Sequence, residues 1–525
     1  MKNRIIVDIE MPGQLGHNPA VLAFFKSIFQ PLFWRTPLLP DPHTEPVLPI
    51  LQPLPGYFAI FLAAFEGVVV STAAPVIVKS LHNFKMISWI FSIFLLTSAI
   101  STPIYGKLAD LYGRKRIFMI GISIFLFGSL LAGLSQTMHQ LIIFRGIQGI
   151  GAGAIFTIGF TMIGDIFTLE ERSIIQGAIS TIWGIAGLVG PLLGGFLIDY
   201  LSWQWIFFIN IPFGLLSVYI LAKFVHEQKP ATNPKIDYLG AILLSIAIGS
   251  LLYGVMSLDE DFYLGVILLV ITLISSILFY LQEARTSEPI VPLFILNKSS
   301  IIVNIITFIS SFILIACSVY LPLHIQSIMG YSATIAGISL IGTSIAWFMS
   351  SISIAKLMKK YPTNIIVMFS SLILIFSSWL LTQLTIDTPL WHLSIYVFFF
   401  GFGFSGTLNT LTFIVQDSVK YNLRGAAVGL NMLTRTLAQT IGVTVLGAVL
   451  NVSTADFIQA HNLINITMQD FYDNTAPQYH ELLRQALFYS LNNIYYILVG
   501  SSVLCLILFY FCLPIAGLLP GLLQG

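Results

Sequence analysis

The chain consists largely of long apolar runs separated by short polar segments. Fourteen such runs follow one another from residue 57 onward. Each has about the 20 residues that an α-helix needs to cross a bilayer. The runs lack the alternation of apolar and polar residues that marks a membrane β-barrel, so the pattern predicts an all-α integral membrane protein in a lipid bilayer. We predict membrane-spanning helices at 57–78, 88–106, 117–134, 139–164, 174–199, 205–224, 237–256, 263–282, 301–321, 332–355, 363–383, 391–415, 425–451 and 490–515.

The start of the chain departs from this pattern. Residues 20–34 are apolar but too short to span a bilayer. For them we expect either a helix that lies in the membrane interface or a disordered tail. Seven prolines between residues 37 and 55 predict a stiff, non-helical linker.

The positions of the charged residues orient the predicted helices. Only 9% of the residues are charged and the net charge is +1, so the composition does not indicate nucleic-acid binding. If the N-terminus is cytoplasmic, 19 of the 24 Lys and Arg residues lie in cytoplasmic segments, three lie outside and two lie within spans. Because basic residues favour the cytoplasmic side, we predict a multi-pass membrane protein with cytoplasmic termini.

The chain contains an internal repeat. Five residues recur at an offset of 252 positions, namely Asp165, Arg172, Gly177, Gly190 and Gly195 as Asp417, Arg424, Gly429, Gly442 and Gly447. Two parallel six-helix halves are typical of one large class of secondary transporter. We therefore divide the chain into an N-terminal tail (1–55), a six-helix half (56–225), two inserted helices (226–300) and a second six-helix half (301–525) with an extracellular loop at 452–487.

Two charged residues lie deep in predicted spans of the first half. A charge in the bilayer costs about 2.5–3.5 kcal/mol, so each requires an explanation. Glu66 can bind and release a proton or bind a cation, or it can simply pair with a neighbouring helix. Arg145 cannot lose its proton, so it must face a carboxylate, backbone carbonyls or water. We predict that Arg145 pairs with Glu66, and the counterpart of Arg145 in the repeat is Val397.

A glycine- and proline-rich stretch lies in the fifth predicted span. AGLVGPLLGG contains Gly190, Pro191, Gly194 and Gly195. Proline removes a backbone hydrogen bond and glycine removes bulk, so we expect the helix to bend and to pack closely. Packing alone and a functional hinge both fit this composition. The three cysteines lie in apolar runs without metal-binding or redox spacing, and no cofactor or metal is predicted.

These motifs together resemble the major facilitator superfamily, and within it the fourteen-span drug:proton antiporters of EmrB/QacA type. GKLADLYGRKRIF (106–118) resembles the superfamily's loop 2–3 motif, and LIIFRGIQGIGAG resembles its helix-4 motif. AGLVGPLLGG resembles the antiporter motif of helix 5, with Ala186 in place of its first glycine. FEGVVVSTAAP resembles the family's helix-1 motif, with Glu66 where Asp is usual, and WQWIFFINIPFG (203–214) matches a further family stretch.

The resemblance implies the cytoplasmic (inner) membrane of a bacterium as the location, and it implies roles for these residues. Asp110 and Arg114, in a loop that also holds Gly106 and Gly113, would form a cytoplasmic charge latch with Asp165 that favours the outward-facing state. Arg145 would poise the protonation of Glu66. The region from Gly190 to Gly195 would restrict proton leak.

The function that we predict is proton-coupled efflux of amphipathic or cationic compounds by a monomer, with small molecules and protons as its partners. No GxxxxGK[ST] loop for a nucleotide occurs in the chain. One alternative keeps the fold and exports a specific metabolite, lipid or siderophore. A second alternative is an uptake symporter, against which the helix-5 motif argues. An enzyme or a receptor is disfavoured because no catalytic constellation of side chains occurs.

Overall fold

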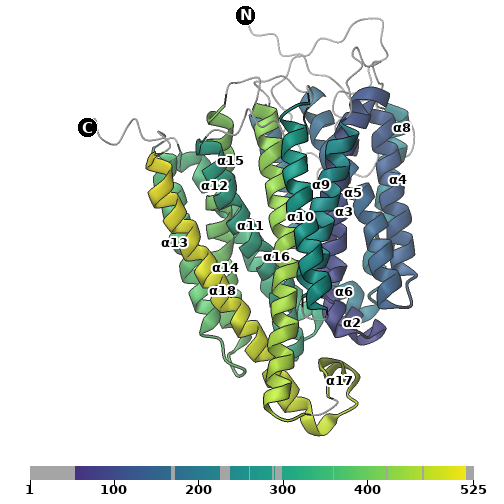
Figure 1. The fold of residues 1–525 in the computed structure, drawn as a ribbon, viewed down its shortest axis with the longest axis vertical. Helices are drawn as coiled ribbons and strands as arrows, with labels where there is room; N and C mark the ends of the chain where they lie inside the picture. Colours follow the sequence, from purple (N-terminus) through teal and green to yellow (C-terminus); the bar gives the residue numbers. More distant parts are fainter. Residues whose placement is uncertain are drawn as a thin grey trace, which may run out of the picture.

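A computed structural model of the chain describes residues 54–166, 172–224, 237–258, 261–286, 289, 298–358, 360–419, 424–463 and 466–515. These residues form a bundle of long helices that run nearly side by side, without a β-strand in the described part of the chain (Figure 1). Thirteen described helices are long and apolar enough to cross a membrane. A shorter apolar stretch, Gly184–Tyr200, belongs to the helix at the fifth predicted range. Each of the fourteen predicted ranges therefore overlaps a described helix.

The helices fall into two halves and a hairpin. The first half contains α2 (Leu54–Leu81), α3 (Trp89–Tyr112), α4 (Arg114–Gly133), α5 (Met138–Ile166), α6 (Arg172–Tyr200), α7 (Trp205–Phe208) and α8 (Asn210–Phe224). The second half contains α11 (Lys298–Leu323), η3 (His324–Ile328), α12 (Ala333–Leu357), α13 (Thr363–Thr382), α14 (Leu390–Phe404), η4 (Ser405–Asn409), α15 (Thr410–Asp417), α16 (Arg424–Ala460), α17 (Met468–Asp473) and α18 (His480–Ile515).

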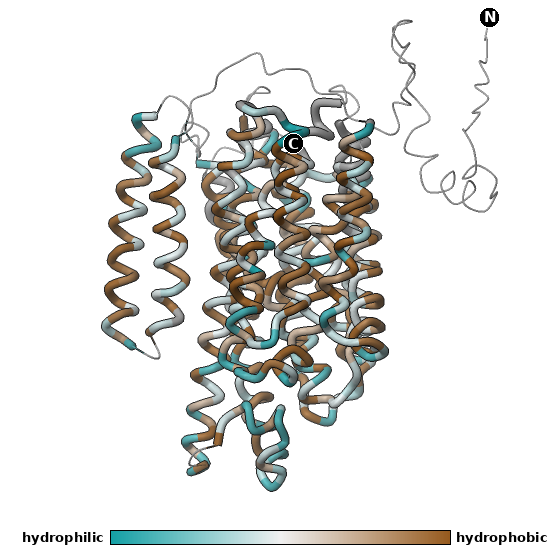
Figure 2. The backbone as a smooth tube through the Cα atoms, turned by 90° about the vertical axis from the view of Figure 1, so that its right-hand side faces the viewer, coloured by the Kyte–Doolittle hydropathy of each residue, from teal (hydrophilic) through white to brown (hydrophobic). Residues whose placement is uncertain are grey.

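The hairpin of α9 (Tyr238–Ser257) and α10 (Phe262–Glu283) stands at the edge of the bundle (Figure 2). Leu244, Ile248 and Leu252 of α9 pack against apolar side chains of α3 and α16. In α10, only Gly265, Ser275 and Glu283 are buried. A helix that is apolar on all its exposed faces is stable in hydrocarbon and not in water, so α10 faces lipid.

The two ends of the bundle are packed differently. At the end that carries α17, one apolar cluster joins side chains of α2 and α3 to those of α11, α16 and α18. At the opposite end, where α3 turns into α4, the described clusters belong to one half each. Hydrogen bonds between the halves also lie toward the α17 end, from Gln326 Nε2 to the Thr72 carbonyl (2.8 Å) and from Asn451 Nδ2 to the Lys85 carbonyl (3.1 Å). The halves are thus closed at the α17 end.

The structure adds detail to three local predictions. Most of the predicted loop 452–487 is helical, because α16 runs to Ala460 and α18 begins at His480. A 37-residue helix is about 55 Å long, well beyond a 30 Å hydrocarbon core. Near the α17 end α16 and α18 support one another, as between Thr454 and Ser490 (2.8 Å). The span predicted at 205–224 is present as Trp205–Lys223, with a turn at Ile209 between α7 and α8. Helix α2 already includes Pro55. Apart from residues 54 and 55, the predicted tail lies outside the described residues.

Candidate functional site

Glu66 and Arg145 meet in the interior of the first half. Glu66 lies near the middle of α2, and Arg145 lies in the third turn of α5. Arg145 Nη1 donates a hydrogen bond to Glu66 Oε1 and forms an ion pair with it. Their side chains are 0% and 1% exposed. The structure thus brings together the two charges that the sequence predicts to pair.

The other contacts of Arg145 complete its coordination. Its Nη1 also donates to Gln148 Oε1 (2.7 Å), and its Nε donates to the Ile90 carbonyl (3.2 Å). The guanidinium lies over the ring of Phe94, 4.2 Å from the centroid, and 5.8 Å from that of Phe207. A desolvated arginine needs this combination of an anion, neutral acceptors and aromatic faces.

Asn210 is a member of the site that the sequence analysis did not single out. Its Nδ2 donates to the second carboxylate oxygen, Glu66 Oε2 (2.6 Å), and to Ser129 Oγ (3.0 Å). The helix is interrupted just before Asn210, where Pro212 has no N–H to donate four residues back. Ser129 Oγ in turn donates to the Phe207 carbonyl next to this interruption (2.8 Å). A buried amide inside the family stretch WQWIFFINIPFG was the available signal.

The site is enclosed, but open space lies beside it. Gly67, the neighbour of Glu66 on α2, is exposed, and a Cβ added there would meet no atom within 4 Å. Gln148 Nε2 and Asn210 Oδ1 are buried without a hydrogen-bond partner. Unsatisfied buried polar atoms are rare in folded proteins and call for an explanation such as water or a functional role. The network is therefore suited to rearrangement when its charge changes.

The glycines of the fifth span hold α6 against two neighbours. Toward α2, a Cβ on Gly194 would overlap the side chain of Val69. Toward α12 of the second half, a Cβ on Gly195 would overlap the backbone of Thr334. The carbonyl of Pro191 touches Gly337 on the same side, and Gly190 packs against α2. The motif forms the seam between the halves near the α17 end, where α12 begins.

The predicted latch is described only in part. Gly113 ends α3 and starts α4 with φ of 95°, a conformation that favours glycine. Gly106 packs near Thr157 of α5, and Arg114 is the first residue of α4. The side chains of Asp110 and Asp165 lie outside the described residues. The latch therefore stays a prediction.

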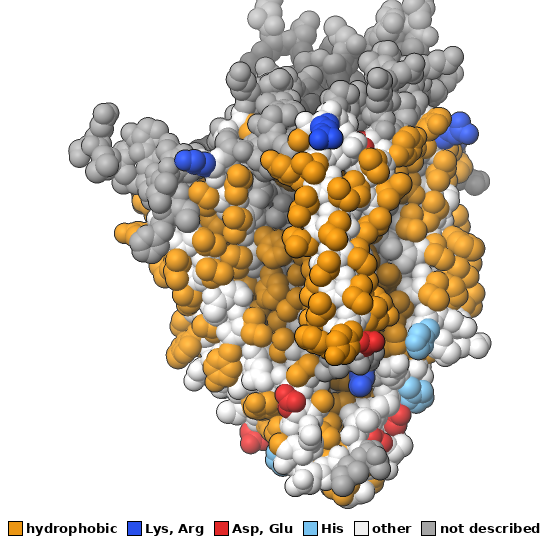
Figure 3. All heavy atoms as spheres, in the orientation of Figure 1, with side chains coloured by type: hydrophobic (Ala, Val, Ile, Leu, Met, Phe, Trp, Pro, Cys, Tyr) orange, Lys and Arg blue, Asp and Glu red, His pale blue; other side chains and the backbone are white. Residues whose placement is uncertain are grey.

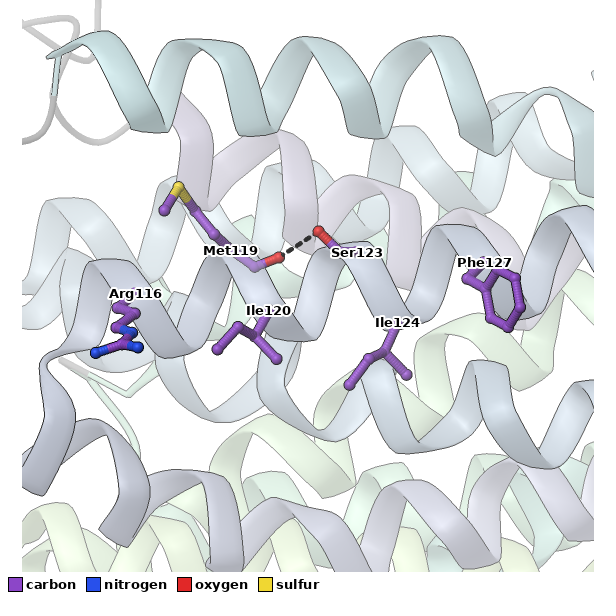
Figure 4. Close-up of a pocket in the computed structure, with 6 residues that line it drawn as sticks. All are labelled: Arg116, Met119, Ile120, Ser123, Ile124 and Phe127. Carbon is purple, nitrogen blue, oxygen red and sulfur yellow. Dashed lines mark hydrogen bonds between the residues drawn. The ribbon is translucent and has the colours of Figure 1, made fainter.

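A shallow groove on α4 is separate from this site. It has a volume of about 420 Å³, and Figure 4 shows its lining side chains along one face of a single helix. A groove lined by one helix lies on the surface of the bundle and not between its halves. Its lining residues are Arg116, Met119, Ile120, Ser123, Ile124 and Phe127.

Comparison with known proteins places the chain among membrane transporters. A family model described as Major Facilitator Superfamily matches residues 56–443. The chain is 33% identical over 395 residues to multidrug resistance protein 3 of Bacillus subtilis, which covers 74% of this chain and 77% of that protein. It is 31% identical over 427 residues to the multidrug transporter protein MdtP of the same organism, covering 80% and 77%.

Solved structures show the same fold at low identity. A bacterial homolog of the human lysosomal transporter Spinster, in an inward-facing and unoccupied conformation, superposes with a TM-score of 0.65. The two share 14% sequence identity, and the match covers 90% of this chain and 98% of that one. At this identity the likeness concerns the fold alone.

Proposed function

The chain belongs to the major facilitator superfamily, and from that premise we propose that it is a proton-coupled exporter of amphipathic or cationic compounds. The observation that carries the proposal is the enclosed network of Glu66, Arg145 and Asn210 beside the open space at Gly67. Two relatives above 30% identity bear the names of multidrug proteins, which supports the broad substrate class. We further propose the fourteen-span EmrB/QacA type and a monomer.

The proposed exchange is centred on the carboxylate of Glu66. In the form described, each of its oxygens accepts a hydrogen bond, one from Arg145 and one from Asn210. A proton added to Oε1 removes the negative charge and so breaks the ion pair. Arg145 keeps its bonds to Gln148 and to the Ile90 carbonyl, so its charge remains partly compensated. A substrate that favours the ionised network releases this proton, and this coupling exchanges the two ligands.

Charge placement gives the proposed orientation. On the face that Figure 3 shows, most Lys and Arg side chains lie at the end opposite α17, whereas Asp, Glu and His gather mostly at the α17 end. Because basic residues favour the cytoplasmic side, we place the α3–α4 turn in the cytoplasm. The arrangement described here is then inward-facing, with its external side closed. In this orientation the proposed latch at Asp110, Arg114 and Asp165 would form in the outward-facing state.

Transport into inside-out vesicles tests this proposal. A pH gradient, acidic inside the vesicle, should drive uptake of cationic dyes and quaternary ammonium compounds without ATP. Collapse of the gradient with a protonophore should stop the uptake. Vesicles that carry the Glu66→Gln variant serve as the control for coupling. If no compound of a broad amphipathic panel moves with the gradient, multidrug export is wrong, and a specific metabolite, lipid or siderophore becomes the better substrate class.

A further inference from the structure

Arg435 is a charge in the membrane that the proposed proton cycle does not use. It lies in α16, within the apolar stretch Ala427–Ala460 of the second half. Its Nη2 donates to the Leu408 carbonyl (2.6 Å) and to Thr412 Oγ1 (2.7 Å). Its Nε is buried and has no hydrogen-bond partner. Among the described residues, no carboxylate forms an ion pair with it.

Two neutral acceptors do not balance the charge of Arg435. An arginine within the bilayer costs about 2.5–3.5 kcal/mol, and its guanidinium stays protonated. Arg145 meets this cost with the carboxylate of Glu66 and two aromatic rings. Among the described residues Arg435 has neither, so within this part of the second half its positive charge is uncompensated.

The surroundings of Arg435 have further unused hydrogen-bonding capacity. The Leu408 carbonyl belongs to η4, a π-helical segment of five residues. Single π turns inside α-helices occur frequently at functional sites. The hydroxyls of Thr407 and Thr410, in the same region, are buried without partners. Hydroxyls and guanidinium N–H groups are donors, and such a set suits a ligand with several acceptor oxygens.

Arg435 is partly exposed and lies on a face of α16 that also contacts the second half. One turn earlier, Asn431 Nδ2 donates to Asn304 Oδ1 (3.1 Å) and Thr307 Oγ1 (3.0 Å) of α11, so this face of α16 points toward the other helices of the second half. Residues 432–437 are all partly exposed. Leu437 and Ile441 of α16 pack with side chains of α3 and α9, and the other described clusters toward this end belong to one half each.

We propose that Arg435 binds the carboxylate of a transported amphipath. Arginine is well suited to this because its fork can donate two parallel hydrogen bonds to a carboxylate. The substrates would then include acidic and zwitterionic amphipaths in addition to cations. This inference rests on the proposed export function, because it assigns a substrate class to the same transporter.

The test compares two fluorescent probes that differ in one group. A zwitterionic xanthene dye with a free carboxylate and the methyl ester of that dye have the same ring system, and only the first is anionic at one end. Binding to purified protein is followed by fluorescence anisotropy in detergent without a pH gradient. We expect the wild type to bind the carboxylate dye at least about tenfold more tightly than the ester, the range of a hydrogen bond to a charged group.

The variants separate recognition from structure. Arg435→Gln should remove the preference for the carboxylate and leave binding of the ester within about twofold, whereas Arg435→Lys should keep part of the preference. Thr436→Ser, at the neighbouring partly exposed position, is the matched control. Equal weakening of both dyes in Arg435→Gln, or no carboxylate preference in the wild type, overturns the proposal.

Comparison of binding with transport distinguishes this inference from the proposed function. Binding without a gradient does not depend on proton coupling, so Glu66→Gln should keep the carboxylate preference while it loses gradient-driven transport. A wild type that prefers the carboxylate dye but shows no gradient-driven uptake of either dye would contradict the export mechanism and leave the assignment of Arg435 intact.

Discussion

The two halves of this transporter give an arginine within a membrane helix opposite surroundings. In the first half, Arg145 has a carboxylate, an amide, a carbonyl and two aromatic rings as neighbours. In the second half, Arg435 has one carbonyl and one hydroxyl and retains an unpartnered Nε. The polar network near it, from Asn431 to Asn304, is otherwise neutral. The repeat preserves the helices of the two halves without preserving their chemistry.

This difference indicates that the two halves have different functions. A closed, compensated network can hold a charge that changes by one proton, since its partners remain in place. An open, uncompensated cation instead attracts a ligand of opposite charge. The proton cycle then belongs to the first half and part of substrate recognition belongs to the second. The experiments below test that division, beginning with the largest expected effect.

Removal of the carboxylate should affect the first half most strongly. In Glu66→Ala, Arg145 remains buried without its anion, and we expect the free energy of unfolding to fall by about 3–5 kcal/mol. In Arg435→Ala two neutral acceptors lose a donor, but the cost of a charge without a carboxylate partner is removed as well, so the net loss should be smaller than about 1 kcal/mol. Denaturant titration of the purified proteins measures both. The double variant Glu66→Ala/Arg145→Ala should recover part of the loss, and equal losses in the two single variants would refute the comparison.

The two buried asparagines provide a finer test. Asn210→Ala leaves a carboxylate oxygen without its donor, which we expect to cost about 1.5–3 kcal/mol of stability. Asn431→Ala removes a donor from two neutral acceptors and should cost about 1 kcal/mol. The same titration measures both variants. A larger loss in Asn431→Ala would mean that the neutral network of the second half contributes more to stability than the charged network of the first half.

The seam between the halves is open to a steric test. Gly195→Val places bulk against the backbone of Thr334 and should destabilise the closed α17 end by about 1–3 kcal/mol. An engineered Ser88→Cys, buried at this end, should then react faster with a membrane-impermeant thiol reagent. Gly429→Ala is the control, because a Cβ there meets nothing within 4 Å. Unchanged labelling in Gly195→Val would show that the seam does not hold this end closed.

The smallest predicted effect is a loss of stability of the α17 segment at low pH. Thr475 Oγ1 and the Thr467 backbone N–H donate to the carboxylate of Asp470, and these bonds lower the pKa of Asp470. The stabilisation is therefore present above the ordinary aspartate range and is lost as the pH falls through the lowered pKa. Hydrogen exchange in residues 466–479 should quicken below about pH 4 beyond the intrinsic pH trend of exchange. Asp470→Asn should lack this increase in exchange rate at low pH, and an increase of equal size in that variant would exclude Asp470 as its cause.

Sequence patterns predicted the features that follow from the free-energy cost of placing polar and charged groups in lipid. The span positions follow from length, and the pairing of Glu66 with Arg145 follows because two lone charges in apolar runs compensate one another. Asn210 was not predicted, since an uncharged amide in an apolar run carries a weaker signal than a charge. Its position depends on the interruption before Pro212, which is a matter of local backbone geometry.

Other features depend on packing that no periodic pattern encodes. The extension of α16 and α18 beyond the membrane was missed because polar residues at 452–487 resemble a loop, although polar helices can stabilise one another in water. The π-helical segment η4, SGTLN, is poor in strong helix formers, but such residues are common in membrane helices and do not by themselves predict a π turn. Its neighbours include α12 and α13. That Arg435 has no carboxylate partner among the described residues could be established only once its neighbours were placed.

The most direct test of the proton cycle is proton release on substrate binding. Purified wild type in weakly buffered detergent solution is mixed with a cationic dye, and the pH of the solution is followed. The account predicts that the wild type releases protons, that Glu66→Asp releases fewer, and that Glu66→Gln releases none although it still binds the dye. Proton release from Glu66→Gln equal to that of the wild type would show that another group carries the proton and would contradict the central role of Glu66.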